Sequence, residues 1–518
     1  MHRRTYHLSL LICLAGLVSL ASAQETYWNQ FRGPTGDGIS QANNLPIEFD
    51  EITNLRWKTA IHDQGWSSPV VWGDQIWLTT AREDGTELFA ICVDLETGNI
   101  VHDIKVFDEP NPQLQYGGHN THATPTPILE AGRAYIHFGS YGTACLDTAT
   151  GETLWENREL KCDHRVRPAS SPVIDGDSLF LTFDGVDVQF VAALDKNTGQ
   201  VLWIKERTGQ KDMRESLKDH GFSDAQAAKV EKMKPDDNRK SYATPTIIQF
   251  DGTKQLISPG AEVTFSYDPQ TGEENWRVKH EGFGYNVASR PVFAHGLVYL
   301  TQGISGRLVA IDPSGQGDVT DTHIAWNSDN RVPEIPSLLV VNDLLFMVSD
   351  RGMLTCLDAV TGEQLWRERL RSGGAFWGSP VYADGKIYIA NAKGTVFVVA
   401  AEREYRLLAS NTFNDDTAKK GSEPDDESES VTAAHVKELL KAQGMSDKEV
   451  ELIYEGARKK GLTNAELAAG LRGEGDGKGG KPASRRRDSG VRFIASPAIA
   501  GNAIILRSET HLYCFAQE

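Results

Sequence analysis

One short phrase recurs along this chain: an aspartate, a Thr-Gly pair and a tryptophan at fixed spacing. In its complete form it runs Asp-x-x-Thr-Gly-x-x-x-Trp. Complete copies begin at Asp147, Asp195, Asp268 and Asp358. A copy at Asp94 has His102 in place of the tryptophan, and the stretch from Asp312 to Trp326 is a looser version. A phrase that returns at intervals of tens of residues is typical of a repeat fold, so the chain is expected to be built from copies of one unit.

Each unit has the same internal order. A Ser or Thr and usually a Pro open a short apolar run, and Gly/Asp/Asn turns separate the alternating runs that follow. This pattern predicts four short strands joined by tight turns, as in a blade of a β-propeller. The openings number eight: Pro69, Pro125, Pro172, Pro245, Pro291, Leu338, Pro380 and Pro497.

The last unit ends after only three predicted strands, at Leu512–Ala516. The phrase Leu55-Arg-Trp57-Lys-Thr near the N-terminus resembles the missing fourth strand. Pairing the two would close the ring and leave no exposed sheet edge at the seam. The sequence therefore predicts an all-β, eight-bladed propeller of four-stranded antiparallel blades, closed by an N-terminal strand.

Two stretches do not fit the blades and are predicted to be helical inserts, at 208–240 and 414–490. Both contain Ser/Thr-x-x-Gln/Glu, the sequence of a capping box, as at Ser223–Gln226 and Ser446–Glu449. The second insert is flanked by acidic and Gly/Lys/Arg-rich runs typical of disorder. Its helices could form a tethered bundle or a docking module. The other boundaries are an N-terminal segment at 24–54, blades one to seven with the closing strand at 55–413, and the eighth blade at 491–518.

Residues 1–23 read as a secretory signal peptide: Arg3 and Arg4, an apolar run, and Ala21-Ser22-Ala23 before the expected cut. Its removal would change the formal net charge from −18 to −20. So acidic a chain is not expected to bind nucleic acid, and no later segment is apolar enough to span a membrane. The expected location is the periplasm or the exterior, as a monomer.

The repeated Asp-x-x-Thr-Gly-x-x-x-Trp blades resemble the pyrroloquinoline-quinone (PQQ)-like propeller superfamily, which includes quinoprotein alcohol dehydrogenases and BamB-like assembly factors. The resemblance covers the mature chain apart from the two inserts. It implies that each tryptophan packs on the Thr-Gly turn of a neighbouring blade, a structural docking role. This role falls to Trp155, Trp203, Trp276, Trp326 and Trp366.

In a propeller, ligands bind in the funnel along the axis. Aligning the openings gives seven hydroxyls and one arginine at the equivalent position: Ser68, Thr124, Ser171, Thr244, Arg290, Ser337, Ser379 and Ser496. The hydroxyls are expected to be structural, while Arg290 would need an anionic partner or water. The loops that enter these strand openings also carry arginines, histidines and aromatic residues. Either these loops bind an anion beside aromatic rings, or their arginines pair with loop carboxylates. The funnel candidates are Arg290, Trp66, His122, Arg167, Tyr242, Glu334, Trp377 and Arg492.

The resemblance also implies PQQ with calcium as a possible cofactor. Quinoprotein dehydrogenases of this kind use an adjacent Cys-Cys pair, which this sequence lacks. No calcium ligands or catalytic base can be assigned, so no metal or catalytic residues are predicted. The first hypothesis is a secreted binding or scaffold propeller that recognises a protein partner or an anionic small molecule. The alternatives are a PQQ-dependent alcohol or sugar dehydrogenase and a BamB-like envelope assembly factor.

Overall fold

The structure is a computed structural model of the 518-residue chain. It describes residues 27–113, 120–208, 218, 223–233, 240–280, 286–303, 306–329, 331–371, 373–413, 437, 440–441, 450–451, 454 and 492–517. The predicted signal peptide lies outside these residues. Two compact units are present, residues 1–414 with 491–518, and residues 415–490.

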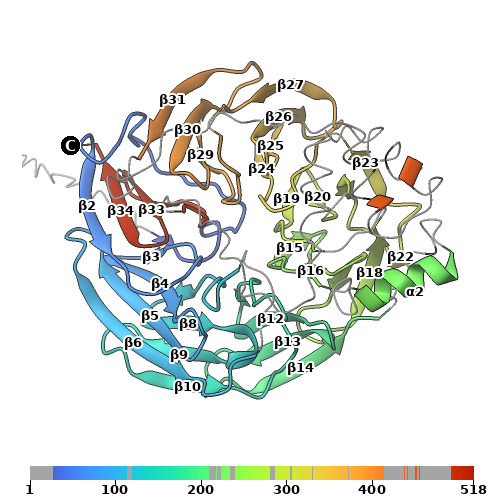
Figure 1. The fold of residues 1–518 in the computed structure, drawn as a ribbon, viewed down its shortest axis with the longest axis horizontal. Helices are drawn as coiled ribbons and strands as arrows, with labels where there is room; N and C mark the ends of the chain where they lie inside the picture. The colour runs from blue at the N-terminus through green and yellow to red at the C-terminus, as the bar shows by residue number, and fades with distance from the viewer. Residues whose placement is uncertain are drawn as a thin grey trace, which may run out of the picture. The chain divides into compact units, whose positions relative to one another are not determined.

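The first unit is a ring of eight antiparallel sheets, as Figure 1 shows. The strands of the first four blades, from the axis outward, are β3 (Val70–Trp72), β4 (Gln75–Ala81), β5 (Glu87–Asp94), β6 (Ile100–Asp108); β7 (Ile128–Glu130), β8 (Arg133–His137), β9 (Thr143–Asp147), β10 (Thr153–Asn157); β11 (Val173–Asp175), β12 (Ser178–Asp184), β13 (Gln189–Asp195), β14 (Val201–Glu206); β15 (Thr246–Phe250), β16 (Thr253–Pro259), β17 (Val263–Tyr267) and β18 (Glu274–Lys279). A short 3-10 helix, η1 (Gly139–Tyr141), precedes β9.

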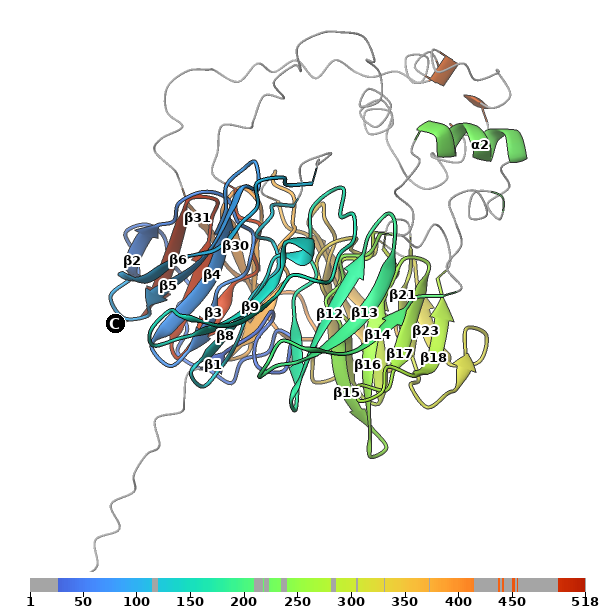
Figure 2. The same ribbon diagram turned by 90° about the horizontal axis from the view of Figure 1, so that it is seen from below.

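The remaining four blades follow the same order around the ring, and Figure 2 shows the blades from the side. Their strands are β19 (Val292–Ala294), β20 (Leu297–Thr301), β21 (Leu308–Ile311), β23 (Ile324–Ser328); β24 (Leu339–Val341), β25 (Leu344–Val348), β26 (Met353–Asp358), β27 (Gln364–Arg369); β28 (Val381–Ala383), β29 (Lys386–Ala390), β30 (Thr395–Ala400), β31 (Leu407–Thr412); and β32 (Ala498–Ala500), β33 (Ala503–Arg507), β34 (His511–Ala516) with β2 (Leu55–Ala60) outermost. Blade four gains a parallel fifth strand, β22 (Gly317–Asp318), from the loop of blade five.

The predicted closure by an N-terminal strand is confirmed. Strand β2 pairs antiparallel with β34, from Leu55 opposite Phe515 to Ala60 opposite His511. The blades are mostly four-stranded and antiparallel, so the predicted fold class is confirmed as well. Apolar residues fill the spaces between blades, and one buried cluster joins blades seven, eight and one across the seam.

The repeated phrase forms the turn before each outer strand. In the copy at Asp147, the Oδ1 atom accepts hydrogen bonds from the N–H groups of Ala149 and Thr150, both at 2.9 Å. These bonds lower the pKa of Asp147. Gly151 follows at φ +78°, a left-handed conformation that side chains disfavour. The aspartate and the glycine are therefore required by the turn.

Most of the tryptophans bind the turn of the next blade. Their Nε1 atoms donate to backbone carbonyls at 2.8–3.2 Å, pairing Trp57 with Leu95, Trp155 with Lys196, Trp203 with Pro269, Trp326 with Ala359 and Trp366 with Glu402. Trp276 differs, because it donates to the Gln255 side chain, which in turn donates to the Pro313 carbonyl. His102, in the tryptophan place of blade one, lies 3.2 Å from the Thr148 carbonyl.

The N-terminal segment crosses the base of the ring. Strand β1 (Tyr27–Trp28) pairs with the inner strand of blade one, and Asn29 exchanges hydrogen bonds with Leu129 of blade two. The segment then reaches blade seven on the other side of the axis, where Gly38 and Ser40 bond to Tyr382. It thus forms a floor across the central channel.

Within the residues that the structure describes, the predicted helical hairpins of the inserts are not seen. Within the first insert, the described residues contain one helix, α2 (Asp224–Met233). It begins with the predicted capping box, in which Ser223 N donates to Gln226 Oε1 at 2.9 Å and Gln226 N to Ser223 Oγ at 3.4 Å. Most of the second insert, including its capping sequences, lies outside the described residues.

The turn glycines offer a matched test of tryptophan docking within blade four. Gly272 (φ +72°) lies under Trp203, so that an added Cβ would sit 2.8 Å from Cε3, whereas Gly252 (φ +77°) faces open space. Gly252→Ala should lower the free energy of unfolding by roughly 1–2 kcal/mol, the cost of a left-handed alanine. Gly272→Ala should lower the free energy of unfolding clearly more, because the indole ring of Trp203 must also move. Urea unfolding measures both, and equal losses would contradict the docking role.

Candidate functional site

The axial channel contains a cavity of about 430 Å³. Its walls come from the loops that enter the inner strands of all eight blades, and Phe31 of the N-terminal segment contributes to its lining. The described residues around it are Phe31, Trp66, Ser68, Asn120, Thr124, Thr126, Val166, Ala169, Ser171, Tyr242, Thr244, Asn286, Ala288, Glu334, Ile335, Ser337, Trp377, Ser379, Ile494, Ala495 and Ser496. Four of the eight predicted funnel candidates are present: Trp66, Tyr242, Glu334 and Trp377.

A ring of hydrogen bonds encircles this cavity. At seven of the eight steps the backbone N–H of one blade donates to the side-chain hydroxyl of the next, at 2.9–3.1 Å. The step from blade four to blade five has no such bond, because Arg290 carries no hydroxyl. The hydroxyls are those of Ser68, Thr126, Ser171, Thr244, Ser337, Ser379 and Ser496. In blade two the ring uses Thr126 where the sequence alignment predicted Thr124. The hydroxyl hydrogens of these seven side chains have no acceptor in the described part of the chain, so they are available to a ligand.

Arg290 occupies the eighth position of the ring but does not line the cavity. Its side chain is buried and turned to the N-terminal segment, where Nη1 donates to the Phe31 carbonyl at 2.5 Å and Nη2 to Gln30 Oε1 at 3.3 Å. Its Nε atom donates to Thr246 Oγ1 at 3.2 Å. Burial lowers the pKa of Arg290 to about 10. The arginine therefore attaches the floor to the ring, a role that its sequence position did not reveal.

Arg32 holds the same floor from the other side. It donates to the carbonyls of Leu338 at 2.5 Å and Pro380 at 3.4 Å, in blades six and seven. Burial lowers its pKa to about 9, and the charge of Arg290 adds to this shift. Sequence reasoning missed Arg32, although it lies in the Gly- and Pro-rich stretch 32–38 that signals a tight turn.

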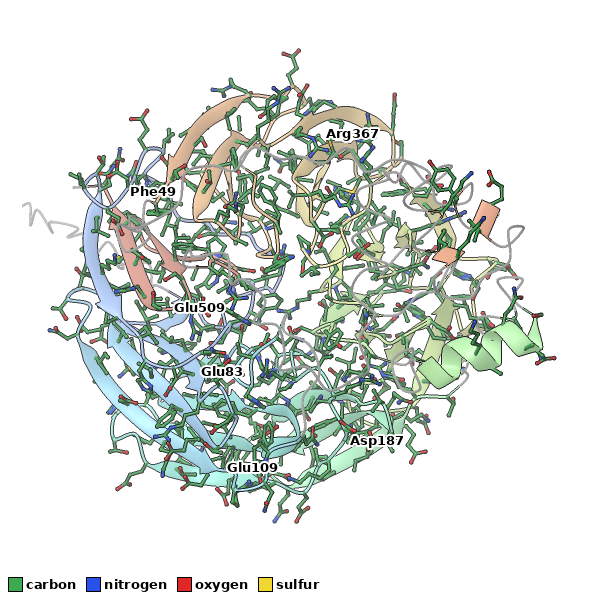
Figure 3. All side chains as sticks on the ribbon, viewed as in Figure 1. Phe49, Glu83, Glu109, Asp187, Arg367 and Glu509 are labelled. Carbon is green, nitrogen blue, oxygen red and sulfur yellow. The ribbon has the colours of Figure 1, made fainter. Side chains whose placement is uncertain are left out.

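The other predicted cations are not among the described lining residues of the cavity. Arg167 donates from Nη1 to the Asn120 carbonyl at 2.8 Å. Arg492 pairs with Glu509 (labelled in Figure 3) at 3.0 Å and lies 5.0 Å from the Trp66 ring centre. His122 is buried, and burial together with the charge of Arg167 lowers its pKa to about 4. These groups shape the wall and do not present charge to its interior.

The lining is thus aromatic and mostly uncharged. Trp66, Tyr242 and Trp377 belong to blades one, four and seven, so aromatic rings stand at separate points of the wall. Asn286 has a buried Oδ1 atom without a hydrogen-bond partner. Glu334 is the one carboxylate among the described lining residues, and removal of water together with the charge of Asp350 raises its pKa. Such a wall favours neutral ligands with hydrogen-bond acceptors.

Family comparison agrees with this architecture. The family model described as "Outer membrane protein assembly factor BamB" matches residues 48–221 and 317–406, just over half of the chain. The chain belongs to the PQQ-like repeat propellers. No curated protein matches its sequence.

Several solved structures are similar to this chain at low sequence identity. BamB from Moraxella catarrhalis is 13% identical, with a TM-score of 0.51 over 89% of this chain and 99% of that chain. The quinohemoprotein alcohol dehydrogenase from Comamonas testosteroni is 14% identical, with a TM-score of 0.39 over 72% and 76%. A europium-containing methanol dehydrogenase is 12% identical, with a TM-score of 0.41 over 72% and 89%.

The lining of this PQQ-like propeller does not fit PQQ and calcium. PQQ is a tricarboxylate and would require cationic partners, but the described lining residues include no Arg, Lys or His. The free Asn286 oxygen and Glu334 would repel its carboxylates. Among the described residues, no group of three or more His, Cys, Asp or Glu side chains could hold a metal ion, and no helix could cross a membrane.

The hydrogen bonds from Arg290 to the N-terminal segment are expected to stabilise the folded protein. Arg290→Ala should lower the free energy of unfolding by about 3–5 kcal/mol, because buried carbonyl and amide acceptors lose their donor. Arg492→Ala should change it by less than about 1 kcal/mol, since its ion pair is partly exposed. Chemical denaturation of both variants provides the comparison. A small loss for Arg290→Ala would contradict the anchoring role.

Three buried histidines should make the protein sensitive to acid. Burial lowers the pKa of His137 to about 3 and of His122 to about 4, and that of His164 well below 6.5. Each is neutral in the folded state but titrates normally when unfolded. The free energy of unfolding is therefore highest above pH ~6.5, where these histidines are neutral in both states. It falls as the pH falls, by up to about 1.4 kcal/mol per pH unit for each histidine. Unfolding at pH 7 and pH 4.5 should show this loss, and His137→Gln should reduce it; an unchanged pH slope in that variant would contradict the assignment.

Proposed function

We propose that this PQQ-like propeller is a non-enzymatic binding scaffold of the cell envelope, acting as an assembly factor of the BamB kind. The observation that carries the proposal is the lining of the axial cavity. Its described residues combine seven free hydroxyl donors, four aromatic rings and amide groups with a single carboxylate. This set suits recognition better than acid–base or redox chemistry, which requires paired ionisable groups or a bound cofactor.

An extended segment of a partner protein is the ligand that this wall suits best. Its backbone carbonyls would accept hydrogen bonds from the free hydroxyl hydrogens, and its apolar side chains would pack on Trp66, Tyr242 and Trp377. The description of the matching family names outer membrane protein assembly. Strands of outer membrane proteins are therefore the first candidates for this ligand. Their alternation of apolar and polar residues would place one face against the aromatic rings.

The predicted signal peptide fits this location, because residues 1–23 would direct the mature chain into the envelope or beyond. The acidic composition also fits a soluble partner-binding protein that avoids nucleic acid. On this proposal, the anionic ligand expected from the sequence is replaced by a neutral one. The cations on which that expectation depended, Arg290, Arg167 and Arg492, are engaged within the protein.

The test uses Trp377 at the cavity wall. A peptide from a β-barrel strand, with alternating aromatic and polar residues, should bind the wild-type protein and change its tryptophan fluorescence. Trp377→Ala should weaken this binding by roughly 5–30-fold, the usual effect of removing an aromatic anchor from an interface. Trp377→Phe should recover most of the affinity, and Val360→Ala, an exposed residue on the outer turn of blade six, should not alter it.

The same titration separates the proposal from the dehydrogenase alternative. PQQ with calcium should leave the melting temperature unchanged and should support no reduction of an electron-accepting dye. A rise in melting temperature together with dye reduction would overturn the proposal in favour of an enzyme. Equal peptide affinity in wild type and Trp377→Ala would remove the cavity as the recognition site.

A further inference from the structure

The ring of hydrogen bonds around the axial cavity is broken at one step, between blades four and five. At that step the backbone N–H of Thr244 has no acceptor within the part of the chain that the structure describes. The residue in the place of the missing hydroxyl is Arg290, whose side chain turns to Phe31 and Gln30 instead. Thr244 lines the cavity, so its N–H group borders the space in which a ligand would lie. We refer to this place as the open step.

Asn286 stands beside the open step, and its side chain is also without a partner. It lines the cavity, and its Oδ1 atom is buried with no hydrogen-bond donor. The side-chain amide makes no hydrogen bond within the described residues, so nothing there holds it in one orientation. A half-turn about its Cβ–Cγ bond can therefore present either the oxygen or the nitrogen to the cavity.

Backbone hydrogen bonds hold these two unpaired groups at the same junction. The chain before Thr244 runs parallel to the chain around Asn286. Asn286 N donates to the Lys240 carbonyl at 2.9 Å, and Tyr242 N donates to the Val287 carbonyl at 2.7 Å. The open step thus combines a donor that is fixed in the backbone with an amide that can turn.

A small side chain beside the open step leaves room for the backbone of a ligand. The residue two positions before each member of the ring also lines the cavity, and in blades one, four and seven it is Trp66, Tyr242 or Trp377. In blade five it is Ala288. A segment in the cavity can therefore place its backbone over Ala288 and a side chain against Tyr242 of the adjacent blade.

We propose that the open step binds one peptide group of the ligand, a proposal that rests on the function proposed above. The peptide carbonyl accepts the Thr244 N–H, and the peptide N–H donates to Asn286 Oδ1. An unpaired donor beside an unpaired acceptor is the complement of a peptide group, and buried polar atoms in proteins are rarely left without a partner. A ligand carboxylate could also accept the Thr244 N–H, but Glu334 lines the same cavity and its charge disfavours a second carboxylate.

The first test compares substitutions of Asn286, using the full chain, the alternating aromatic and polar strand peptide, and tryptophan fluorescence. Asn286→Gly removes the amide without straining the backbone, since glycine readily adopts the φ of +56° found there. It should weaken peptide binding by roughly 5–10-fold, the effect of one lost hydrogen bond. Asn286→Asp keeps an acceptor oxygen, so its affinity should stay within about threefold of the wild type.

Asn342→Gly is the matched control for the glycine variant. Asn342 has a similar φ of +50°, but it is exposed and is not among the described lining residues of the cavity. Its substitution should leave the peptide affinity unchanged.

The second test locates the peptide group on the ligand. In a series of the same peptide, each member carries an ester in place of one backbone amide and so lacks one N–H. One position should weaken binding by roughly 5–10-fold with the wild type and with Asn286→Asp. The loss at that position should largely disappear with Asn286→Gly, because the acceptor is already gone.

An ester loss of equal size in the wild type and Asn286→Gly would overturn the open step, and it would leave the cavity as the recognition site if Trp377→Ala still weakens binding. Equal weakening by Asn286→Asp and Asn286→Gly would also overturn it, because the oxygen would then not be the group that binds. Absence of peptide binding to the wild-type protein would overturn the proposed function as well. If Asn286→Gly does not fold, the ester series with the wild type and Asn286→Asp decides, and the lack of one sensitive position would contradict the proposal.

Discussion

The pairing of β2 with β34 is the constraint on which the rest of this structure depends. It joins residues more than 450 positions apart and closes a ring that would otherwise expose two sheet edges. It also dictates the path of the chain before β2. Strand β1 pairs at the inner edge of blade one, whereas β2 lies at the outer edge of blade eight, so the residues between them must travel from the axis to the rim. That path crosses the channel, and the central space becomes a cavity with a floor.

Arginine is the residue that fixes this floor, and the reason is geometric. Arg32 and Arg290 each donate to acceptors from different parts of the chain, which the planar guanidinium can do from one side chain. Arg507 bonds the Ser67 and Thr79 carbonyls of blade one from blade eight in the same way. Burial lowers the pKa values of these groups to about 9, 10 and 9, which reflects the cost of their charge. Carbonyl acceptors offset that cost, and the charge of Asp37 also favours the charged forms of Arg32 and Arg290.

The fold could be predicted from sequence because its signals are local and repeated. The Asp-x-x-Thr-Gly turn locates the strand boundaries, and counting the strand openings beside it predicted eight blades. The unit with only three strands at the C-terminal end predicted the closing strand. The candidate site was harder to predict, because it depends on contacts between residues that are not part of the repeated pattern. Arg290 stands out in the alignment, but its partners, Gln30 and Phe31, lie about 260 residues away. In blade two, Thr124-Pro125-Thr126-Pro127 offers two equivalent slots, and only the ring of hydrogen bonds selects Thr126.

Asp350 supports the wall of the axial cavity from outside its lining. Its oxygens accept the backbone N–H groups of Glu334 at 2.8 Å and Ile335 at 3.2 Å, and both of these residues line the cavity. Burial raises the pKa of Asp350. A protonated Asp350 would hold these N–H groups more weakly, because a neutral acceptor makes weaker hydrogen bonds than a charged one. One buried carboxylate therefore positions part of the wall on which the proposed recognition depends.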